Sequence, residues 1–599
     1  MRRWIERITL TPGREAAVAG ALALALFVAG TGEVPIFGRD EARFAQAARE
    51  MLDRGDLVVP TFAGQGRYHK PILHYWCTMA SYRLLGVNER AARLPSNLAG
   101  ALVIAVVAAA ARRRFGAGAG LLAGLLLAVT PVVWVEARAC TADMVLLLPT
   151  LVMMLAFERL LAGDGGRRDA LLFWAAMAVA ILAKGPVAPA WVLCTGLALW
   201  AMGRRWQRWE VAAAAVLLGL GWWRLGPLVL AAPAAVAALE LLRSPDGRQA
   251  VARLRPGWGL PVLVAITAPW AVAASMATDG AFLREAIGTH VVARGQTAFE
   301  SHGFFAGFYV VTAVVTALPW FGALVERLLP MRVWLADRRQ RFLVAWLLGP
   351  LVLLELYQTK LAHYWMPSFP AGVLLVVGWL WSASPARRVG VAGRVLQAVG
   401  GAALAAALLA VPLTIPVPSL VPAAALAAAL VAAATAAAVA LAGRRPAAGA
   451  ATGALGLGLA LLVVAGLYLP ELGRHALGPA AARRAVELER DGERIVVFKP
   501  RDEEIFFYLP VNVRACRDAG CMAALPAAGS DWLAVARRDD LELLREEWRA
   551  AQLVEVDRVR GVDAGRARWD EQVLFRVVRR ARPPGRGAAG GVDRQEVHP

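Results

Sequence analysis

The chain has 599 residues, 58% of them hydrophobic, and a formal net charge of +20 at pH 7. This is more apolar sequence than the core of a soluble protein needs, and it comes in segments long enough to cross a bilayer. A soluble protein this basic would be expected to bind nucleic acid. Here many of the arginines lie in short loops between apolar segments, as they do in the cytoplasmic loops of membrane proteins. We therefore expect a polytopic α-helical membrane protein and no nucleic-acid partner.

The N-terminal segment Met1–Arg14 contains four arginines and one acidic residue, Glu6. Because basic segments that flank a span are retained in the cytoplasm, we expect this end to be cytoplasmic. The apolar run Glu15–Thr31 has no clear small-residue cleavage site, so we interpret it as a membrane anchor and not as a removed signal peptide. The next polar segment, Arg39–Trp76, then lies outside.

Arg39–Trp76 is the most polar early interval of the chain. It opens on a predicted helix, with Asp40 as the N-cap, apolar residues at spacings of four, and Gly55 as the stop. Asp40 and Arg43 are one helical turn apart and are therefore neighbours. After an extended stretch and a glycine turn, the loop reaches Lys70 just before the next apolar segment. The loop thus brings an acidic pair, an arginine and a lysine to one membrane face.

Further apolar segments follow this loop, and the criterion of about 20 residues per span gives about 13 to 15 transmembrane helices in total. Arginine clusters between them, from Arg112–Arg114 to Arg444-Arg445, mark successive cytoplasmic loops. By alternation, four later polar segments lie on the same outer face as Arg39–Trp76. These segments are Glu136–Asp143, the region near Lys184, Thr278–Ala306 and Gln358–Tyr364.

The composition changes after residue 470. Short strands are predicted at Arg494–Phe498, Glu504–Tyr508 and Trp532–Val535, and a charged helix at Asp539–Ala551. We expect a transmembrane domain at residues 1–470, with external loops at 32–96 and 277–306, and a small soluble, extracytoplasmic α/β domain at 471–581. The tail at 582–599 is rich in Gly, Pro and Arg and is predicted to be disordered.

The five cysteines have no paired spacing of the kind that binds metal. Only Cys516 and Cys521 lie close together in polar sequence. An extracytoplasmic, oxidising location would allow a disulfide between them. Two ordinary thiols are the alternative.

Several motifs resemble those of one group of enzymes. In the first external loop they are Asp40-Glu41-x-Arg43-Phe44, Arg49–Leu52 with Gly55-Asp56, Tyr68-x-Lys70-Pro71 and Tyr75-Trp76. Later ones are Ala137-Arg138 with Asp143, Leu182-x-Lys184-Gly185, His290-x-x-x-Arg294, Pro319-Trp320 and Lys360-Leu361-x-x-Tyr364-x-x-Pro367. The set is spread over residues 30–380 and resembles the bacterial aminoarabinose transferases that modify lipid A and the protein O-mannosyltransferases. These are GT-C membrane glycosyltransferases that use polyprenyl-phosphate sugars.

The resemblance implies a GT-C fold and transfer of a sugar from a polyprenyl-phosphate donor to a lipid A-like glycolipid or to a protein. It also implies a place in the bacterial inner membrane, among its lipids, with the active site and the C-terminal domain facing the periplasm. Asp40 corresponds to the family's catalytic aspartate and Lys70 to its phosphate-binding lysine. Lys360 and Tyr364 fall in its lysine–tyrosine segment. No cofactor is required for this chemistry.

Elementary chemistry asks for the same residue types. As a sugar leaves a lipid phosphate, negative charge grows on the phosphate oxygens, and cationic donors stabilise it. Candidates for this role are Lys70, Arg294 and Lys360. A carboxylate must also orient the acceptor, or deprotonate it when the acceptor is a hydroxyl, and Asp40 is the first candidate with Glu41 second. The further substrate-binding candidates are Arg43, Tyr68, Asp143, Lys184, His290 and Tyr364.

Several of these residues have simpler interpretations. Asp40 is suited to capping an interfacial helix, and Asp143 lies at a predicted helix N-terminus, where the dipole favours an acid. His290 and Arg294 would also suit a loop that simply faces water. Lys184 lies in apolar sequence, where charge is costly, and this favours a functional or pairing role.

His69, His74 and His290 can be combined on paper into a divalent-metal site. Their spacing is not fixed, and a lipid monophosphate leaving group does not require a metal. A metal therefore stays an open alternative without assigned ligands.

Two other function classes compete with a transferase. A transporter or flippase for a lipid-linked substrate would show charges in mid-span and repeat symmetry, and the sequence shows neither. A non-catalytic envelope scaffold would explain the C-terminal domain but leave the acidic loop without a role. The sequence therefore favours a glycosyltransferase that uses a polyprenyl-phosphate sugar. It does not identify the sugar or the acceptor, because several helices and loops together shape such a cavity.

Overall fold

The computed structural model describes residues 11–204, 229–287, 304–381, 388–490, 493–525, 532–547 and 551–579, with short breaks at 512, 564–565 and 567, together with isolated positions between 205 and 228. The predicted site residues His290 and Arg294 and the tail at 582–599 lie outside these residues. The chain divides into two compact units, Met1–Ala476 with Ala564–Arg568 and Leu477–Asp563 with Trp569–Pro599. Each unit is described by itself.

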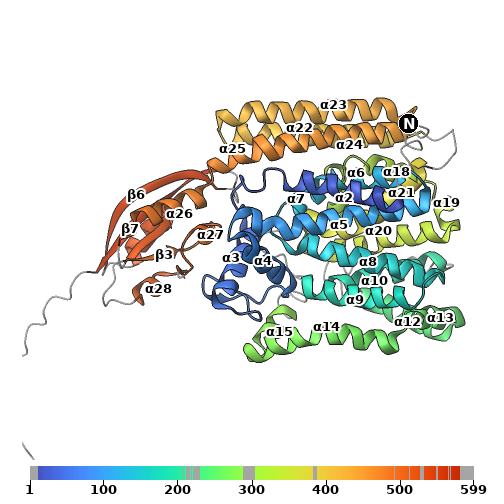
Figure 1. Ribbon diagram of the computed structural model, residues 1–599, viewed down its shortest axis with the longest axis horizontal. Helices are drawn as coiled ribbons and strands as arrows, with labels where there is room; N and C mark the ends of the chain where they lie inside the picture. The colour runs from blue at the N-terminus through green and yellow to red at the C-terminus, as the bar shows by residue number, and fades with distance from the viewer. Residues whose placement is uncertain are drawn as a thin grey trace, which may run out of the picture. The chain divides into compact units, whose positions relative to one another are not determined.

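The first unit is a bundle of helices in which α3 and α4 lie at one end (Figure 1). Its elements up to residue 204 are α2 (Pro12–Val28), α3 (Arg39–Arg54), β1 (Thr61–Phe62), β2 (Gln65–Gly66), α4 (Leu73–Leu85), α5 (Glu89–Phe115), α6 (Ala119–Ala128), α7 (Pro131–Ala137), α8 (Ala142–Ala162), α9 (Arg167–Lys184) and α10 (Val187–Gly203). From residue 229 on they are α12 (Ala231–Arg243), α13 (Pro245–Arg253), α14 (Pro256–Ala277), α15 (Ala281–Ile287), α17 (Phe308–Thr316), α18 (Phe321–Leu328), α19 (Met331–Ala336), α20 (Arg338–Leu356), η4 (Ala362–Ser368), α21 (Phe369–Trp381), α22 (Val391–Thr414), η5 (Pro418–Leu420), α23 (Val421–Ala442), α24 (Pro446–Val463), η6 (Val464–Tyr468) and α25 (Leu469–Arg474).

Seven helices in the described residues are long and apolar enough to cross a membrane, or eight if α6 and α7, which are bent by 72°, form one span. These helices fit the predicted polytopic helical membrane protein. The number is below the predicted total of about 13 to 15. One reason is length, since α10 has only 17 residues. Another is charge, because α9 and α20 carry several charged side chains at their ends.

The amphipathic helix α3 turns its apolar residues, such as Phe44, toward the protein interior. Gly55 ends the helix in the left-handed conformation, with a φ of 66°, as its position in the sequence predicts. The predicted N-cap is wrong, because Gly38 and not Asp40 occupies that position. Asp40 lies in the first turn, where the helix dipole favours an acidic side chain.

A buried ion pair fixes α3 to the bundle. Arg93 of α5 donates hydrogen bonds to both carboxylate oxygens of Glu41, at 2.7 and 2.9 Å. Glu41 also accepts a hydrogen bond of 2.9 Å from the backbone N–H of Cys140, in the turn between α7 and α8. These bonds hold the first turn of α3 against α5 and the α7–α8 turn.

The hairpin of β1 and β2 follows α3 and leads to the segment that contains Lys70. Glu50 of α3 is buried beneath this hairpin. Its carboxylate accepts hydrogen bonds from the backbone N–H groups of Ala63 and Gly64, at 2.8 and 3.3 Å. Because these are charged hydrogen bonds in a buried place, they fix the hairpin on α3.

The second unit has a five-stranded mixed sheet in the order β4-β3-β5-β7-β6. Its elements are α26 (Leu477–Leu488), β3 (Arg494–Phe498), α27 (Ile505–Tyr508), β4 (Arg514–Cys516), α28 (Ala519–Ala523), β5 (Trp532–Arg537), α29 (Arg538–Glu547), β6 (Ala551–Asp563) and β7 (Arg568–Arg579). β3 pairs parallel with β4 and β5, and β5 pairs antiparallel with β7. Both helices and strands are present, as the sequence predicts.

The strands predicted at Arg494–Phe498 and Trp532–Val535 are confirmed as β3 and the start of β5. The strand predicted at Glu504–Tyr508 is wrong, because this segment forms the helical turn α27. Ile505, Phe506 and Phe507 are all buried. In so short an apolar run, periodicity cannot distinguish a buried helical turn from a buried strand.

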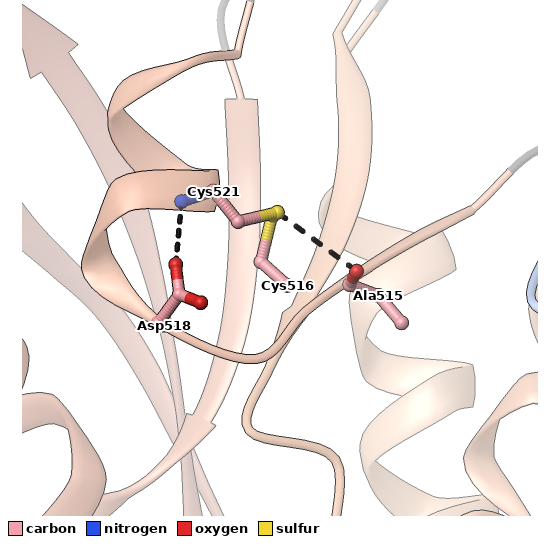
Figure 2. The surroundings of a disulfide bond; sticks show 4 residues. All are labelled: Ala515, Cys516, Asp518 and Cys521. Atoms are coloured by element: carbon pink, nitrogen blue, oxygen red, sulfur yellow. Dashed lines mark hydrogen bonds between the residues drawn. A yellow bond between two sulfur atoms is a disulfide. The ribbon is translucent and has the colours of Figure 1, made fainter.

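The structure contains a disulfide between Cys516, at the end of β4, and Cys521 of α28 (Figure 2). The N–H of Cys521 also donates a hydrogen bond of 2.7 Å to the Asp518 carboxylate, which caps α28. Of the two alternatives open from the sequence, the structure therefore has the disulfide. The bond closes a short loop at the edge strand of the sheet.

Candidate functional site

A cavity of about 190 Å³ lies in the first unit. Its wall is formed by α3, the loop before α4, the α7–α8 turn with the start of α8, the end of α9, and the segment between α20 and α21. The charged and titratable residues in the wall are Asp40, Arg43, Arg67, His69, Lys70, Glu136, Asp143, Lys184 and His363. Segments that are far apart in the sequence therefore meet at one site.

Six of the predicted site residues line this cavity: Asp40, Arg43, Lys70, Asp143, Lys184 and Tyr364. Three others lie elsewhere in the described residues, namely Glu41, Tyr68 and Lys360. His290 and Arg294 fall outside the described part of the chain. The sequence interpretation did not include Arg67, Glu136 or His363, which also line the cavity.

Asp40 lies on α3 among cationic side chains. Its Oδ1 atom is 3.8 Å from Nη1 of Arg43, one turn further along the helix. Partial burial raises the pKa of Asp40, but the positive charges of Lys70 and Arg43 outweigh this effect and lower the pKa below its usual value. Asp40 is therefore a carboxylate at neutral pH, able to accept a hydrogen bond from a hydroxyl or an amine.

Arg67 is buried in the cavity wall and held by neighbours on two sides. Its Nε–H donates a hydrogen bond of 3.0 Å to the hydroxyl of Tyr75, and its guanidinium lies 5.4 Å from the ring centroid of Phe44. These contacts give the cation one orientation before any ligand binds. With Lys70 in the same wall, Arg67 adds positive charge near the carboxylate of Asp40.

Asp143 and Lys184 form an ion pair at the cavity wall. Lys184 Nζ, at the end of α9, lies 2.6 Å from Oδ1 of Asp143 in the first turn of α8. The lysine also lies 5.0 Å from the ring centroid of Tyr364. The pairing role expected of Lys184 from its apolar sequence is thus present, and it joins α8, α9 and η4 at the cavity.

His363 stands between two carboxylates. Its Nδ1 is 3.3 Å from Oε1 of Glu136, and its Nε2 is 3.8 Å from Oδ1 of Asp143. The hydroxyl of Thr141 donates a hydrogen bond of 2.7 Å to the other oxygen of Glu136. This arrangement joins η4 to α7 and α8.

Lys360 is fully buried beside the cavity, whose wall includes its neighbours Thr359 and Leu361. Its ammonium group lies 3.2 Å from Oε2 of Glu355, and that carboxylate accepts hydrogen bonds from the backbone N–H groups of Gly307 and Tyr309. Burial lowers the pKa of Lys360, and Glu355 offsets part of this effect. These contacts give Lys360 a place in the support of the cavity, whereas phosphate binding by Lys360 stays a prediction.

Tyr68 and Glu41, the other predicted residues outside the wall, make structural contacts. The ring of Tyr68 packs edge-on against Phe282 of α15, with centroids 5.6 Å apart. Glu41 is buried in its ion pair with Arg93. The carboxylate next to Asp40 in the sequence therefore faces away from the cavity lining and holds the helix in place.

Among the described residues, no group of three or more His, Cys, Asp and Glu side chains is arranged to hold a metal ion. His69 lines the cavity and lies 3.4 Å from Glu285. His74 is buried, with its Nε2 atom 3.5 Å from Sγ of Cys140. A metal stays without assigned ligands.

Comparison with known proteins relates the chain to membrane glycosyltransferases. Residues 69–222 match the family model described as dolichyl-phosphate-mannose-protein mannosyltransferase. An undecaprenyl phosphate-α-4-amino-4-deoxy-L-arabinose arabinosyl transferase of Pseudomonas aeruginosa is 28% identical over 340 residues, which are 55% of this chain and 52% of that protein. The Serratia proteamaculans protein of the same name is 25% identical over 369 residues, 60% of this chain and 59% of its own length. The matched region thus spans about half the length of these curated relatives.

Two crystal structures share the fold over almost the whole chain. ArnT from Cupriavidus metallidurans bound to undecaprenyl phosphate has a TM-score of 0.70 and 24% sequence identity, covering 94% of this chain and 97% of ArnT. The apo state of the same protein has a TM-score of 0.69 with the same identity and coverage. The predicted fold class, a polytopic helical membrane protein with a C-terminal α/β domain, is confirmed by this likeness.

Proposed function

We propose that this chain, a relative of the GT-C glycosyltransferases of the dolichyl-phosphate-mannose-protein mannosyltransferase and aminoarabinose transferase kind, transfers a sugar from a polyprenyl-phosphate donor to an acceptor of the cell envelope. The observation that carries the proposal is the composition of the cavity wall. It combines the ionised carboxylate of Asp40 with the cations of Arg43, Arg67 and Lys70. This is the pairing of charges that the reaction needs.

The cations act on the departing phosphate. When the bond between the anomeric carbon and the phosphate oxygen breaks, its electron pair stays on that oxygen and the phosphate becomes more negative. Arg67 and Lys70 stabilise this charge, and Arg67 is already held in one orientation by Tyr75 and Phe44. Little reorganisation of the protein is then needed as the charge develops.

Asp40 acts on the acceptor. Its carboxylate accepts a hydrogen bond from the acceptor hydroxyl and takes the hydroxyl proton as the oxygen bonds to the anomeric carbon. For an amine acceptor the same contact orients the nucleophile. Because neighbouring cations hold the pKa of Asp40 low, the residue is ionised and ready at neutral pH, while its main contribution is orientation rather than high basicity.

The finer assignments rest on the relatives. The names of the curated relatives specify undecaprenyl phosphate and 4-amino-4-deoxy-L-arabinose, so we propose undecaprenyl phosphate as the carrier and an aminopentose or a hexose as the sugar. A lipid A-like glycolipid or an envelope protein would be the acceptor. The site would face the periplasm in the bacterial inner membrane.

Transfer is tested with membranes that contain the chain and radiolabelled undecaprenyl-phosphate sugars. Asp40→Asn and Lys70→Ala should each lower the rate by about 10² to 10⁴-fold, because each removes a group that acts on the reacting atoms. Matched controls are Asp53→Asn on the exposed side of α3 and Arg83→Ala on α4, which should keep wild-type rates. Undiminished transfer by both cavity variants would rule out this mechanism.

The acceptor is identified by mass spectrometry of envelope glycolipids and glycoproteins from a strain that lacks the chain. Loss of an aminosugar from a glycolipid assigns a glycolipid acceptor. Loss of a hexose from proteins assigns a protein acceptor. An unchanged envelope would contradict a transferase that acts on either class.

A further inference from the structure

His363 occupies a position in the cavity wall that the reaction scheme above leaves unused. Its two ring nitrogens point at carboxylate oxygens on different helices, Nδ1 at Glu136 and Nε2 at Asp143, at 3.3 and 3.8 Å. The side chain is 20% exposed, so a proton can be exchanged with the cavity. The ring thus lies across the space between α7 and α8.

This geometry favours one protonation state. A neutral imidazole has a single N–H, so one of its nitrogens would direct a lone pair at a carboxylate oxygen. The imidazolium has an N–H on each nitrogen, so it faces both carboxylates with an N–H group and forms an ion pair with each, at 3.3 and 3.8 Å. Histidine is also the side chain whose charge ordinarily changes between pH 5 and 8.

Several helices pack against η4, which contains His363. Their titratable side chains are mostly acidic or already form an ion pair. Glu136 and Asp143 face it from α7 and α8, and Asp143 is shared with Lys184 of α9. From α20 the acidic group is Glu355, which is paired with Lys360. On its own element, the ring of Tyr364 packs edge-on against the imidazole, with centroids 4.9 Å apart. The other elements packed against η4 are α21, which is apolar, and α17, whose titratable side chain is Tyr309.

The summed charge of the cavity wall indicates a function for the proton on His363. Among the described wall residues, the carboxylates are Asp40, Glu136 and Asp143, and the permanent cations are Arg43, Arg67, Lys70 and Lys184. Four positive and three negative charges leave one positive charge, which matches the single negative charge of a sugar–phosphate–prenyl diester. The released phosphate monoester gains a second negative charge, and the imidazolium supplies the second positive one.

We propose that His363 is a positioning residue whose protonated ring holds Glu136 and Asp143 at the cavity wall, so that sugar transfer depends on the protonation of His363. The inference rests on the proposed function. It adds a titratable residue that acts through the two carboxylates, without contact with the reacting atoms. The protonated form is the active one, because only that form bridges both acids and balances the charge of the released phosphate.

The test compares pH–rate profiles of the wild type, His363→Gln and His363→Arg, with undecaprenyl-phosphate sugar as the donor. Glutamine is neutral at every pH, whereas arginine is always charged. At the acidic end we expect His363→Gln to be roughly tenfold slower than the wild type, because the variant lacks the positive charge between the two carboxylates. The two rates should converge as pH rises and the wild-type ring loses its proton. The rate of the wild type should therefore fall as the pH rises. The rate of His363→Arg should not fall in this way, because arginine keeps its charge.

His69 also lines the cavity and is present in all three proteins, so the ratio of wild-type to variant rates isolates the effect of position 363. His475→Gln, a change after α25 outside the cavity wall, is the matched control and should follow the wild-type profile. A His363→Gln rate equal to that of the wild type at every pH would overturn the inference. So would a rate lower by one constant factor at every pH, because that is the mark of a purely structural role.

The outcomes for the two proposals are distinguishable. If the wild type transfers no sugar, the proposed function fails and this inference fails with it. If the wild type transfers sugar and Asp40→Asn abolishes transfer, but the rates of wild type and His363→Gln do not converge, only the role of His363 is overturned.

Discussion

Asp40 and Glu41 are adjacent acidic residues, but their side chains have different surroundings. Asp40 lines the cavity near Arg43 and Lys70. Glu41 points about a quarter-turn away along the helix and is buried against Arg93. Successive residues of a helix point in different directions, so one motif supplies both a group for chemistry and a group for anchoring α3.

Replacement of Glu41 should act on stability. Glu41→Gln leaves the Arg93 charge buried without its ion-pair partner, so we expect the free energy of unfolding to fall by about 3 to 5 kcal/mol. Asp53→Asn, at an exposed position of the same helix, should change it by less than about 0.5 kcal/mol. Denaturant unfolding in detergent measures both. A Glu41→Gln protein as stable as the wild type but inactive would instead assign Glu41 to the chemistry.

Motif spacing and the resemblance to GT-C enzymes led to Asp40, Arg43 and Lys70, and the structure brings all three to one cavity. Glu136 and His363 could not be predicted in this way. Each is close in sequence to a recognised motif, but their importance comes from a contact of 3.3 Å between residues on different elements. No local pattern encodes such a contact in a single sequence.

The junction of α20 and η4 supports the cavity. Glu355, near the end of α20, accepts hydrogen bonds from the N–H groups of Gly307 and Tyr309, at 3.1 and 3.2 Å, and pairs with Lys360. The start of α17, the end of α20 and the segment before η4 are thus joined through one carboxylate. The cavity residue His363 follows directly on this junction.

A double-mutant cycle on Glu355 and Lys360 separates support from phosphate binding. If the pair is a support, Glu355→Gln and Lys360→Met should each lower the free energy of unfolding by roughly 3 kcal/mol, and the double variant should be no worse than the more damaged single variant. Thermal unfolding and the donor KM are measured for all four proteins. A donor KM raised by Lys360→Met alone, with additive effects in the double variant, would assign Lys360 to the phosphate.

Element prediction succeeded where periodicity and end signals agree. α3 has an amphipathic pattern and a terminal glycine, and its C-terminal end is where the sequence predicts it. The turn α27 is too short for a period to be measured, and a run of buried apolar and aromatic residues of this length also suits a strand. The long strands β6 and β7 were not predicted, because frequent charged residues interrupt their apolar alternation.

The stability of the second unit has a pH dependence of its own. Burial raises the pKa of Glu504 to about 7, and the negative charges of Asp502 and Asp563 act in the same direction. The folded unit therefore prefers the neutral carboxyl. The contribution of this group to stability is full below its unfolded pKa of about 4.3 and is lost as the pH rises to about 7.

Glu504→Gln should remove this dependence, because glutamine resembles the neutral carboxyl. At pH 8 we expect the variant's second unit to be more stable than the wild type by about 1 to 3 kcal/mol, and at pH 4 the two should be equal. Pulse proteolysis in urea measures the stability of this unit in the full chain. Glu542→Gln, at an exposed position of α29, serves as the control. If Glu504→Gln shows no pH-dependent gain in stability over the wild type, the role of Glu504 is contradicted.

The sequence predicted a polytopic membrane protein with polar loops that converge on one face, and the structure places side chains from five parts of the first unit around one cavity. The number of spans and the shape of the cavity are harder to predict from the sequence. Apolar segments look alike whether they cross the bilayer, bend or stop short of it. The bent pair α6 and α7 is an example. Its second helix carries Glu136, so the bend brings a carboxylate to the site.

The most direct measurement is an experimental structure of the chain with undecaprenyl phosphate. We expect the phosphate to lie in the cavity, within hydrogen-bonding distance of Lys70 and Arg67 and on the same side as Asp40. A phosphate bound outside this cavity, without contact to Lys70 or Arg67, would contradict the proposed role of the cavity.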